Sequence, residues 1–262
     1  MEKSKLIMFM GPCVVESPAV TSAIAASLKD IVANYPDVRF CFKASFDKAN
    51  RTRADAFRGV GKEYGIEILR SIYHEIKVPV ITDVHSVKDI ELIQDFVSVI
   101  QIPAMLCRQT DLLLAAAETG KPLNIKKMQM MAPDDMKYVI EKIRTRSDAE
   151  LFLTERGTTF GHGDLVVDFR SFHTMSGFGA KVIFDASHSL QRPSLYGKSG
   201  STPDARDIAP KMARAAVAFG VDGVFLECHH NPLKARCDGD TSLYLSQIDK
   251  LLQDLTAIRN VG

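Results

Sequence analysis

The sequence has few cysteines and no pair of them at Cys-x-x-Cys spacing. The five cysteines are Cys13, Cys41, Cys107, Cys228 and Cys237. An odd number of cysteines in a chain of this size argues against a disulfide framework. We therefore expect reduced thiols, each of which is by default a small core side chain.

Long hydrophobic runs and an excess of charge of one sign are also absent. The apolar stretch 6–10 is far shorter than a signal peptide's apolar region or the about 20 residues of a membrane span. There are 33 basic and 32 acidic residues, which give a net charge of +1. The chain therefore lacks the excess of basic residues that is typical of nucleic-acid-binding proteins. We expect a cytoplasmic protein that binds neither nucleic acid nor membranes.

The composition is sufficient for one large core. Apolar residues make up 46% of the chain and charged residues 25%, which are ordinary values for a globular protein. The length of 262 residues is close to the roughly 250 residues of a (β/α)8 barrel. We expect a single domain over residues 1–262.

Eight short β-rich runs alternate with helical patterns. The runs cover residues 6–12, 38–45, 78–84, 97–103, 123–127, 150–154, 181–185 and 223–227. Strands that alternate with helices pair in parallel through right-handed crossovers, and eight such units can close into a barrel. The prediction is an α/β protein with a single-domain (β/α)8 TIM barrel, and an open doubly wound sheet is the alternative.

The helical patterns lie between these runs. Helices are predicted over 19–34, 66–76, 88–96, 111–118, 133–145 and 203–219, and a last one over 245–258 has apolar residues at helical spacing. Residues 192–203 are rich in serine, glycine and proline, which predicts a long mobile loop that could close as a lid.

The end of nearly every predicted strand carries a chemically active side chain. The residues are Cys13, Lys43, Asp83 with His85, Gln101, Lys126, Arg156, His188 and Glu227. In a barrel all these strand ends meet at the C-terminal mouth, where such enzymes build their active sites. One polar residue at a strand end is ordinary, but eight at one face indicate a site.

Cations gather in these segments although the protein has almost no net charge. They are Lys43, Lys48, Arg51, Arg108, Lys126 and Arg156. Cations that converge on one mouth need anions, and phosphates are the natural candidates. Lys43 and Lys126 also allow a second interpretation, because a barrel lysine can form a Schiff base with a carbonyl substrate.

Metal-ligand residue types form a second group at the same mouth. They are Cys13, His188, Glu227 and Asp238. A thiolate, an imidazole and carboxylates together suit a borderline divalent ion such as zinc or iron(II). Taken singly, Cys13 is more typical of buried filler and His188 of a hydrogen-bonded mouth residue. His229 and His230 are weaker candidates as ligands.

Several strings resemble the 3-deoxy-D-manno-octulosonate 8-phosphate synthase family over nearly the whole chain. They are GPC (11–13), FKASFDKANR (42–51), QIPA (101–104), CRQTD (107–111), NIKK (124–127), LTERGTTFG (153–161), VDFR (167–170) and DASHS (185–189).

The resemblance implies condensation of phosphoenolpyruvate with D-arabinose 5-phosphate and water, as a homotetramer, in lipopolysaccharide synthesis. The related 3-deoxy-heptulosonate 7-phosphate synthases use erythrose 4-phosphate and have Lys-Pro-Arg-Thr where this chain has Lys-Ala-Asn-Arg at 48–51. That difference favours arabinose 5-phosphate. A non-catalytic phosphosugar-binding barrel is the alternative outside enzymes, although the complete set of site residues argues against it.

The resemblance also implies roles for individual residues. It assigns phosphoenolpyruvate to Lys43, Lys48, Gln101, Arg108, Lys126 and Arg156, and the sugar phosphate to Asn50, Arg51, Thr52 and Ser199. It assigns catalytic roles to Lys43, Asp83, His85 and His188.

The same resemblance implies a divalent metal, which is zinc, iron(II) or manganese. One branch of the family binds it through Cys, His, Glu and Asp, and the other branch has Asn at the cysteine position and needs no metal. Cys13 therefore places the chain in the metal-dependent branch, with Cys13, His188, Glu227 and Asp238 as ligands. Two features depart from that pattern: the Cys237-Asp238-Gly239 loop resembles the metal-independent branch, and Ser201 replaces a usual glycine.

Overall fold

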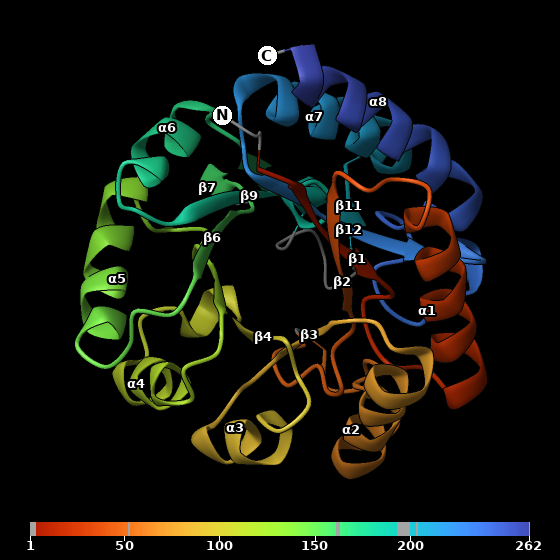
Figure 1. The fold of residues 1–262 in the computed structure, drawn as a ribbon, viewed down its shortest axis with the longest axis horizontal. Helices are drawn as coiled ribbons and strands as arrows, with labels where there is room; N and C mark the ends of the chain where they lie inside the picture. The colour runs from red at the N-terminus through yellow and green to blue at the C-terminus, as the bar shows by residue number, and fades with distance from the viewer. Residues whose placement is uncertain (1–3, 52, 161–162, 193–199, 203, 262) are drawn as a thin grey trace.

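The protein is a parallel β-barrel surrounded by helices, seen here in a computed structural model that describes residues 4–51, 53–160, 163–192, 200–202 and 204–261 (Figure 1). The barrel strands are β1 (Leu6–Gly11), β2 (Val38–Lys43), β3 (Val80–Asp83), β4 (Val99–Ile102), β5 (Leu123–Lys126), β6 (Leu151–Glu155), β9 (Lys181–Asp185) and β12 (Gly223–His229). Each pairs in parallel with its neighbour in this order, and β12 pairs with β1. This closure confirms the predicted barrel and excludes the open sheet.

Helices follow the strands and form the outer ring in Figure 1. They are α1 (Pro18–Val32), α2 (Lys62–Ser71), α3 (Val87–Ile93), α4 (Thr110–Glu118), α5 (Met136–Arg144), α6 (Arg170–Ser176), α7 (Ala205–Phe219) and α8 (Ile248–Val261). The predicted helices are all present, with ends shifted by a few residues. Within the described ranges, no helix is long and apolar enough to cross a membrane.

The sequence interpretation missed some elements. Helix α6 is only seven residues long, too short for a periodic apolar pattern to stand out. Two hairpins are also new: β7 (Thr158–Phe160) with β8 (Asp164–Val166), and β10 (Gln191–Arg192) with β11 (Gly200–Ser201). The second hairpin includes parts of the predicted lid over 192–203, of which residues 193–199 and 203 lie outside the described part of the chain.

The predicted helix over 66–76 is two elements. Helix α2 continues into a π-helical turn at Ile72–Ile76. The turn ends at Lys77, which has a left-handed backbone with φ of 60° and donates its N–H to the Ile72 carbonyl at 3.1 Å. The π-turn closes the helix just before β3.

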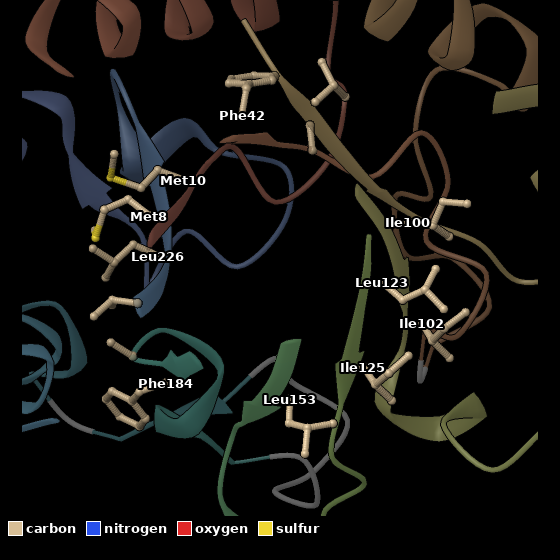
Figure 2. Close-up of a cluster of buried hydrophobic side chains, with 14 of the residues drawn as sticks. Met8, Met10, Phe42, Ile100, Ile102, Leu123, Ile125, Leu153, Phe184 and Leu226 are labelled. Atoms are coloured by element: carbon tan, nitrogen blue, oxygen red, sulfur yellow. The ribbon is translucent and has the colours of Figure 1, made fainter. Parts of the chain in front are cut away.

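Alternation along the strands separates two hydrophobic layers. Figure 2 shows members of the outer layer, such as Met8, Met10 and Phe184. This layer belongs to the large core cluster packed between strands and helices. The inner layer fills the barrel with residues from seven strands: Ile7, Phe9, Cys41, Ile81, Val99, Phe152, Ile183 and Phe225. Because successive side chains on a strand point to opposite faces, the parity of each residue fixes its layer.

The same parity brings polar residues to the barrel mouth. On five strands, the next inward-facing residue lies two positions beyond an inner-layer residue and is polar. These residues are Lys43, Asp83, Gln101, Asp185 and Glu227. The hydrophobic filling of the barrel is therefore capped by a charged layer at the C-terminal ends of the strands. This is the end at which barrel enzymes place their active sites.

Candidate active site

A cavity of about 810 Å³ opens at the C-terminal mouth of the barrel. Its volume is within the usual range for small-molecule sites. The structure brings most of the predicted residues to its wall: Lys43, Lys48, Asn50, Arg51, Asp83, Gln101, Lys126, Arg156, His188 and Asp238. Thr52 and Ser199 lie outside the described residues.

Asp83 is the centre of one half of the site. Its carboxylate lies 3.9 Å from the ammonium groups of both Lys43 and Lys48. It also accepts hydrogen bonds from the Ser45 hydroxyl and the Gln101 amide. Burial alone would raise the pKa of Asp83, but Lys43 and Lys48 hold it well below its usual value. Asp83 is therefore a buried anion that holds the ammonium groups of two lysines at the cavity wall.

A chain of hydrogen bonds across the barrel strands fixes the amide of Gln101. Thr154 donates to the Asn124 side-chain oxygen at 2.6 Å, and Asn124 donates to the Gln101 side-chain oxygen at 2.8 Å. The amide nitrogen of Gln101 is thereby directed at Asp83. Each buried polar group in this chain has a partner, which makes the network rigid.

Asp185 is the centre of the other half, and the sequence interpretation did not single it out. Its carboxylate accepts a hydrogen bond from Lys126 and lies 2.9 Å from Nδ1 of His188. Backbone N–H groups of Ser187 and His188 donate to its other oxygen. The signal that could have found it is strand parity, because Asp185 lies two residues beyond Ile183 of the inner layer.

The charges around Asp185 shift one another's pKa values. Burial opposes ionisation of Asp185, yet His188 and Lys126 hold its pKa well below the usual value. Burial also lowers the pKa of His188, but the Asp185 carboxylate outweighs this effect and raises it to about 10. The pKa of Lys126 is lowered, because burial and the cations Lys43 and Arg156 outweigh Asp185.

Arg156 lines the cavity and has one nitrogen without a partner among the described residues. Its Nη2 donates to the side-chain oxygen of Gln191 at 2.9 Å. Its Nη1 is buried and has no hydrogen-bond partner among the described residues. A buried guanidinium with a free N–H group is suited to a planar bond to phosphate or carboxylate.

Four predicted residues among those described are not part of the cavity wall: Cys13, His85, Arg108 and Glu227. Arg108 is exposed. The His85 ring is edge-on to the Phe46 ring at 6.2 Å between centroids, and its backbone N–H donates to Asp89 at 2.9 Å. Asp89 belongs to a capping box with Ser86 that starts α3. The cap therefore fixes the His85 backbone directly after β3.

Metal-ligand side chains meet at one corner of the cavity. Two groups of donors lie close enough to hold one ion: Cys13, His188 and Glu227, and Cys13, Cys237 and Asp238. His188 Nε2 lies 3.4 Å from a Glu227 oxygen and 3.5 Å from an Asp238 oxygen. The four residues predicted as ligands are thus close together, joined by Cys237.

The donors at this corner fit a divalent ion. Both carboxylate oxygens of Glu227 are fully buried, and neither accepts a hydrogen bond from any described residue. Such a carboxylate is costly unless a cation satisfies it. Asp185 contacts Nδ1 of His188 and leaves Nε2 facing the two other carboxylates, as is usual for metal-binding histidines.

The weaker histidine candidates lie elsewhere. His229 Nδ1 accepts the Asn231 N–H at 3.0 Å, and its Nε2 lies 3.7 Å from Glu16. His230 is exposed. Neither belongs to a group of possible metal ligands among the described residues.

Comparison with known proteins gives consistent matches over nearly the whole chain. The sequence profile of the DAHP synthetase I family matches residues 2–260. A protein of Desulfatibacillum aliphaticivorans named 2-dehydro-3-deoxyphosphooctonate aldolase is 49% identical over 257 residues, which cover 98% of this chain and 93% of that protein. Proteins of the same name from a Cyanothece and a Geobacter species are each 47% identical, over 95% and 97% of this chain and 90% and 92% of their own lengths.

Burial of His85 predicts a neutral ring near pH 7. Burial lowers the pKa of His85, although Asp83 and Asp89 oppose the shift. Between this lowered value and the unfolded value of about 6.5, the unfolded chain binds more protons, so His85 reduces stability as the pH falls through that window. An NMR titration should give a midpoint below 6.5, with His85→Gln identifying the signal. A midpoint above 6.5 would contradict the structure.

Proposed function

Because the chain belongs to the DAHP synthetase I family, we propose that it condenses phosphoenolpyruvate with D-arabinose 5-phosphate and water. The products are 3-deoxy-D-manno-octulosonate 8-phosphate, a precursor for lipopolysaccharide, and inorganic phosphate. The observation that supports this reaction best is the ring of cations that Asp83 and Asp185 hold around the mouth of the cavity. The relatives' shared name, 2-dehydro-3-deoxyphosphooctonate aldolase, agrees with it.

The phosphoenolpyruvate site is formed by the deep cations. Lys126, Arg156 and Lys43 are buried in the cavity wall, where low dielectric strengthens their attraction for phosphate and carboxylate. Lys48 and the side-chain amide of Gln101 complete this substrate site. Nη1 of Arg156 has no partner among the described residues, so it is available to the anion. Arg108, which the family resemblance also assigns to this substrate, lies outside the cavity wall.

The sugar phosphate occupies the outer part of the cavity. Asn50 is exposed there, and Arg51 is partly exposed. Thr52 and Ser199 are assigned to the same phosphate by the family resemblance. This arrangement brings the aldehyde end of the sugar toward the deep cations and leaves its phosphate near the opening.

The bond changes follow from this placement. C3 of the enol phosphate donates its electron pair to the aldehyde carbon, whose oxygen takes up a proton, and water adds at C2. The resulting hemiketal phosphate breaks its C2–O bond to phosphate and becomes the ketone. Lysine and arginine side chains around the reacting atoms stabilise the oxyanion and the departing phosphate. An enclosed pair of substrates raises effective concentration and limits access of bulk water.

The metal part of the proposal concerns Cys13, His188, Glu227 and Asp238. These residues would hold one divalent ion, whose identity among zinc, iron(II) and manganese is left to experiment. When bound, such an ion can act as a Lewis acid toward an oxygen of a substrate or of water. We also propose a homotetramer in the cytoplasm, on the family resemblance alone.

The substrate assignment predicts phosphate release only when both substrates are present. Phosphoenolpyruvate with D-arabinose 5-phosphate should release phosphate with matching formation of the eight-carbon acid, and erythrose 4-phosphate should turn over at least about tenfold more slowly. The measurement is a colorimetric phosphate assay with product mass spectrometry. Equal turnover with erythrose 4-phosphate would contradict the assignment.

A Schiff-base aldolase is the second candidate, because the lowered pKa of Lys126 favours a neutral amine nucleophile. Borohydride would then trap a substrate adduct on Lys126, and the same reaction mixture tests for it. Substrate turnover without any trapped adduct favours the condensation.

The metal assignment predicts that exhaustive chelation abolishes activity and that a divalent ion restores it. Cys13→Ala should lose tightly bound metal, because one of the ligands is removed. Metal content by plasma mass spectrometry and phosphate release should fall together. Cys107→Ala, which alters a buried thiol that contacts Met131 and belongs to neither donor group, should keep both. Full activity in a metal-free sample would refute the requirement.

A further inference from the structure

We propose that Cys237 is a second sulfur ligand of the divalent ion, bound next to Cys13. The inference rests on the metal site of the proposed function and concerns a residue outside the four ligands assigned there. Its basis is the position of the Cys237 sulfur relative to the other donors.

The sulfur of Cys237 is as close to the ligand cluster as any assigned donor. Cys13 Sγ lies 2.9 Å from Cys237 Sγ. Cys13 Sγ also lies 3.0 Å from Asp238 Oδ2. One donor atom from each of these three residues lies within 4.8 Å of the others. Both cysteines are nearly fully buried and neither forms a disulfide.

The backbone explains how two adjacent residues face one point. In an extended chain, Cys237 and Asp238 would point to opposite sides. Asp238 instead has a left-handed backbone with φ of 51°, and its carbonyl accepts the Ser242 hydroxyl at 2.9 Å. A Cβ at the following Gly239 would lie 2.3 Å from the Pro232 carbonyl oxygen, so only glycine allows this tight turn.

A side-chain donor fixes the position of the Cys237 sulfur. Arg51 donates from Nη1 to Cys237 Sγ at 2.9 Å, which holds this sulfur beside Cys13. The two carboxylate oxygens of Glu227 have no hydrogen-bond partner among the described residues. They provide an independent sign that a cation belongs in the adjoining group of Cys13, His188 and Glu227.

The distances require only a small adjustment. Tetrahedral sites with zinc–sulfur bonds of about 2.3 Å separate two sulfurs by about 3.8 Å, so the 2.9 Å gap between Cys13 and Cys237 must open by roughly 0.9 Å. The His188 distances of 3.4 and 3.5 Å to the two carboxylates already suit ligands of one ion. Cys13 belongs to both donor groups, one with Cys237 and Asp238 and the other with His188 and Glu227, so an ion bound at Cys13 lies beside Cys237 as well.

A second sulfur changes which ion the site prefers. Thiolates favour zinc, whereas carboxylates and water suit manganese. Because Cys237 adds a soft ligand, the intact site should select zinc over manganese more strongly than a site with Cys13 as its sole sulfur. This preference gives a test that does not depend on catalysis.

X-ray absorption at the zinc edge of the full-length, zinc-loaded protein measures the number of sulfur neighbours directly. We expect two sulfurs at about 2.3 Å in the wild type and one in Cys237→Ser. Zinc affinity should fall by at least about tenfold in this variant, and manganese affinity should change much less. Cys107→Ala, which alters a buried thiol outside both donor groups, should retain two sulfurs and the wild-type affinities, and circular dichroism checks folding of each variant.

The outcomes separate this inference from the function. One sulfur neighbour in both the wild type and Cys237→Ser would overturn the second ligand and leave the proposed site intact, with Cys237 serving as a hydrogen-bond acceptor for Arg51. A wild-type chain that binds no divalent ion would overturn both the metal assignment and this inference. Substrate condensation in that metal-free chain would still uphold the proposed reaction.

Discussion

Burying a charge costs free energy, and the structure depends on how that cost is offset at the barrel mouth. There the buried carboxylates of Asp83 and Asp185 pair with buried cations. Each carboxylate is buried and contacts cations on neighbouring elements: Lys43 and Lys48 for Asp83, and Lys126 with His188 for Asp185. An unpaired charge at such depth would be strongly destabilising. The acids therefore hold the cations in place, while Nη1 of Arg156, which has no hydrogen-bond partner among the described residues, can bind an incoming anion.

Strand alternation explains both what the sequence predicted and what it missed. The barrel, its eight strands and most site residues could be predicted, because β-rich runs end in polar residues at regular intervals. Asp185 was missed because His188, three residues further on, was taken as the active side chain of that strand end, although the parity of Asp185 with Ile183 turns it inward. His85 was predicted from its place at a strand end and Arg108 from its charge, and the family motifs gave both a role. None of these signals shows whether a side chain faces the cavity. Cys237 could not be assigned because its direction depends on the left-handed turn at Asp238.

Asp185 connects the two chemical parts of the site. One of its oxygens contacts Lys126, which faces the anion ring, and the same carboxylate orients His188 at the metal corner. Occupation of either part therefore changes the electrostatic surroundings of the other. This shared carboxylate explains how an ion at Cys13 and a phosphorylated substrate at Arg156 can belong to one reaction, although Cys13 follows β1 and Arg156 follows β6.

The most direct test of the cation ring is equilibrium binding of phosphoenolpyruvate to wild-type protein and to Arg156→Gln. Hydrogen bonds to charged groups contribute about 1.5–3 kcal/mol, so the variant should bind about 10- to 100-fold more weakly. Arg146→Gln, which alters an exposed arginine paired with Glu118, should bind like the wild type. Equal affinity of Arg156→Gln and wild type would contradict the account of the mouth as an anion site built on buried cations.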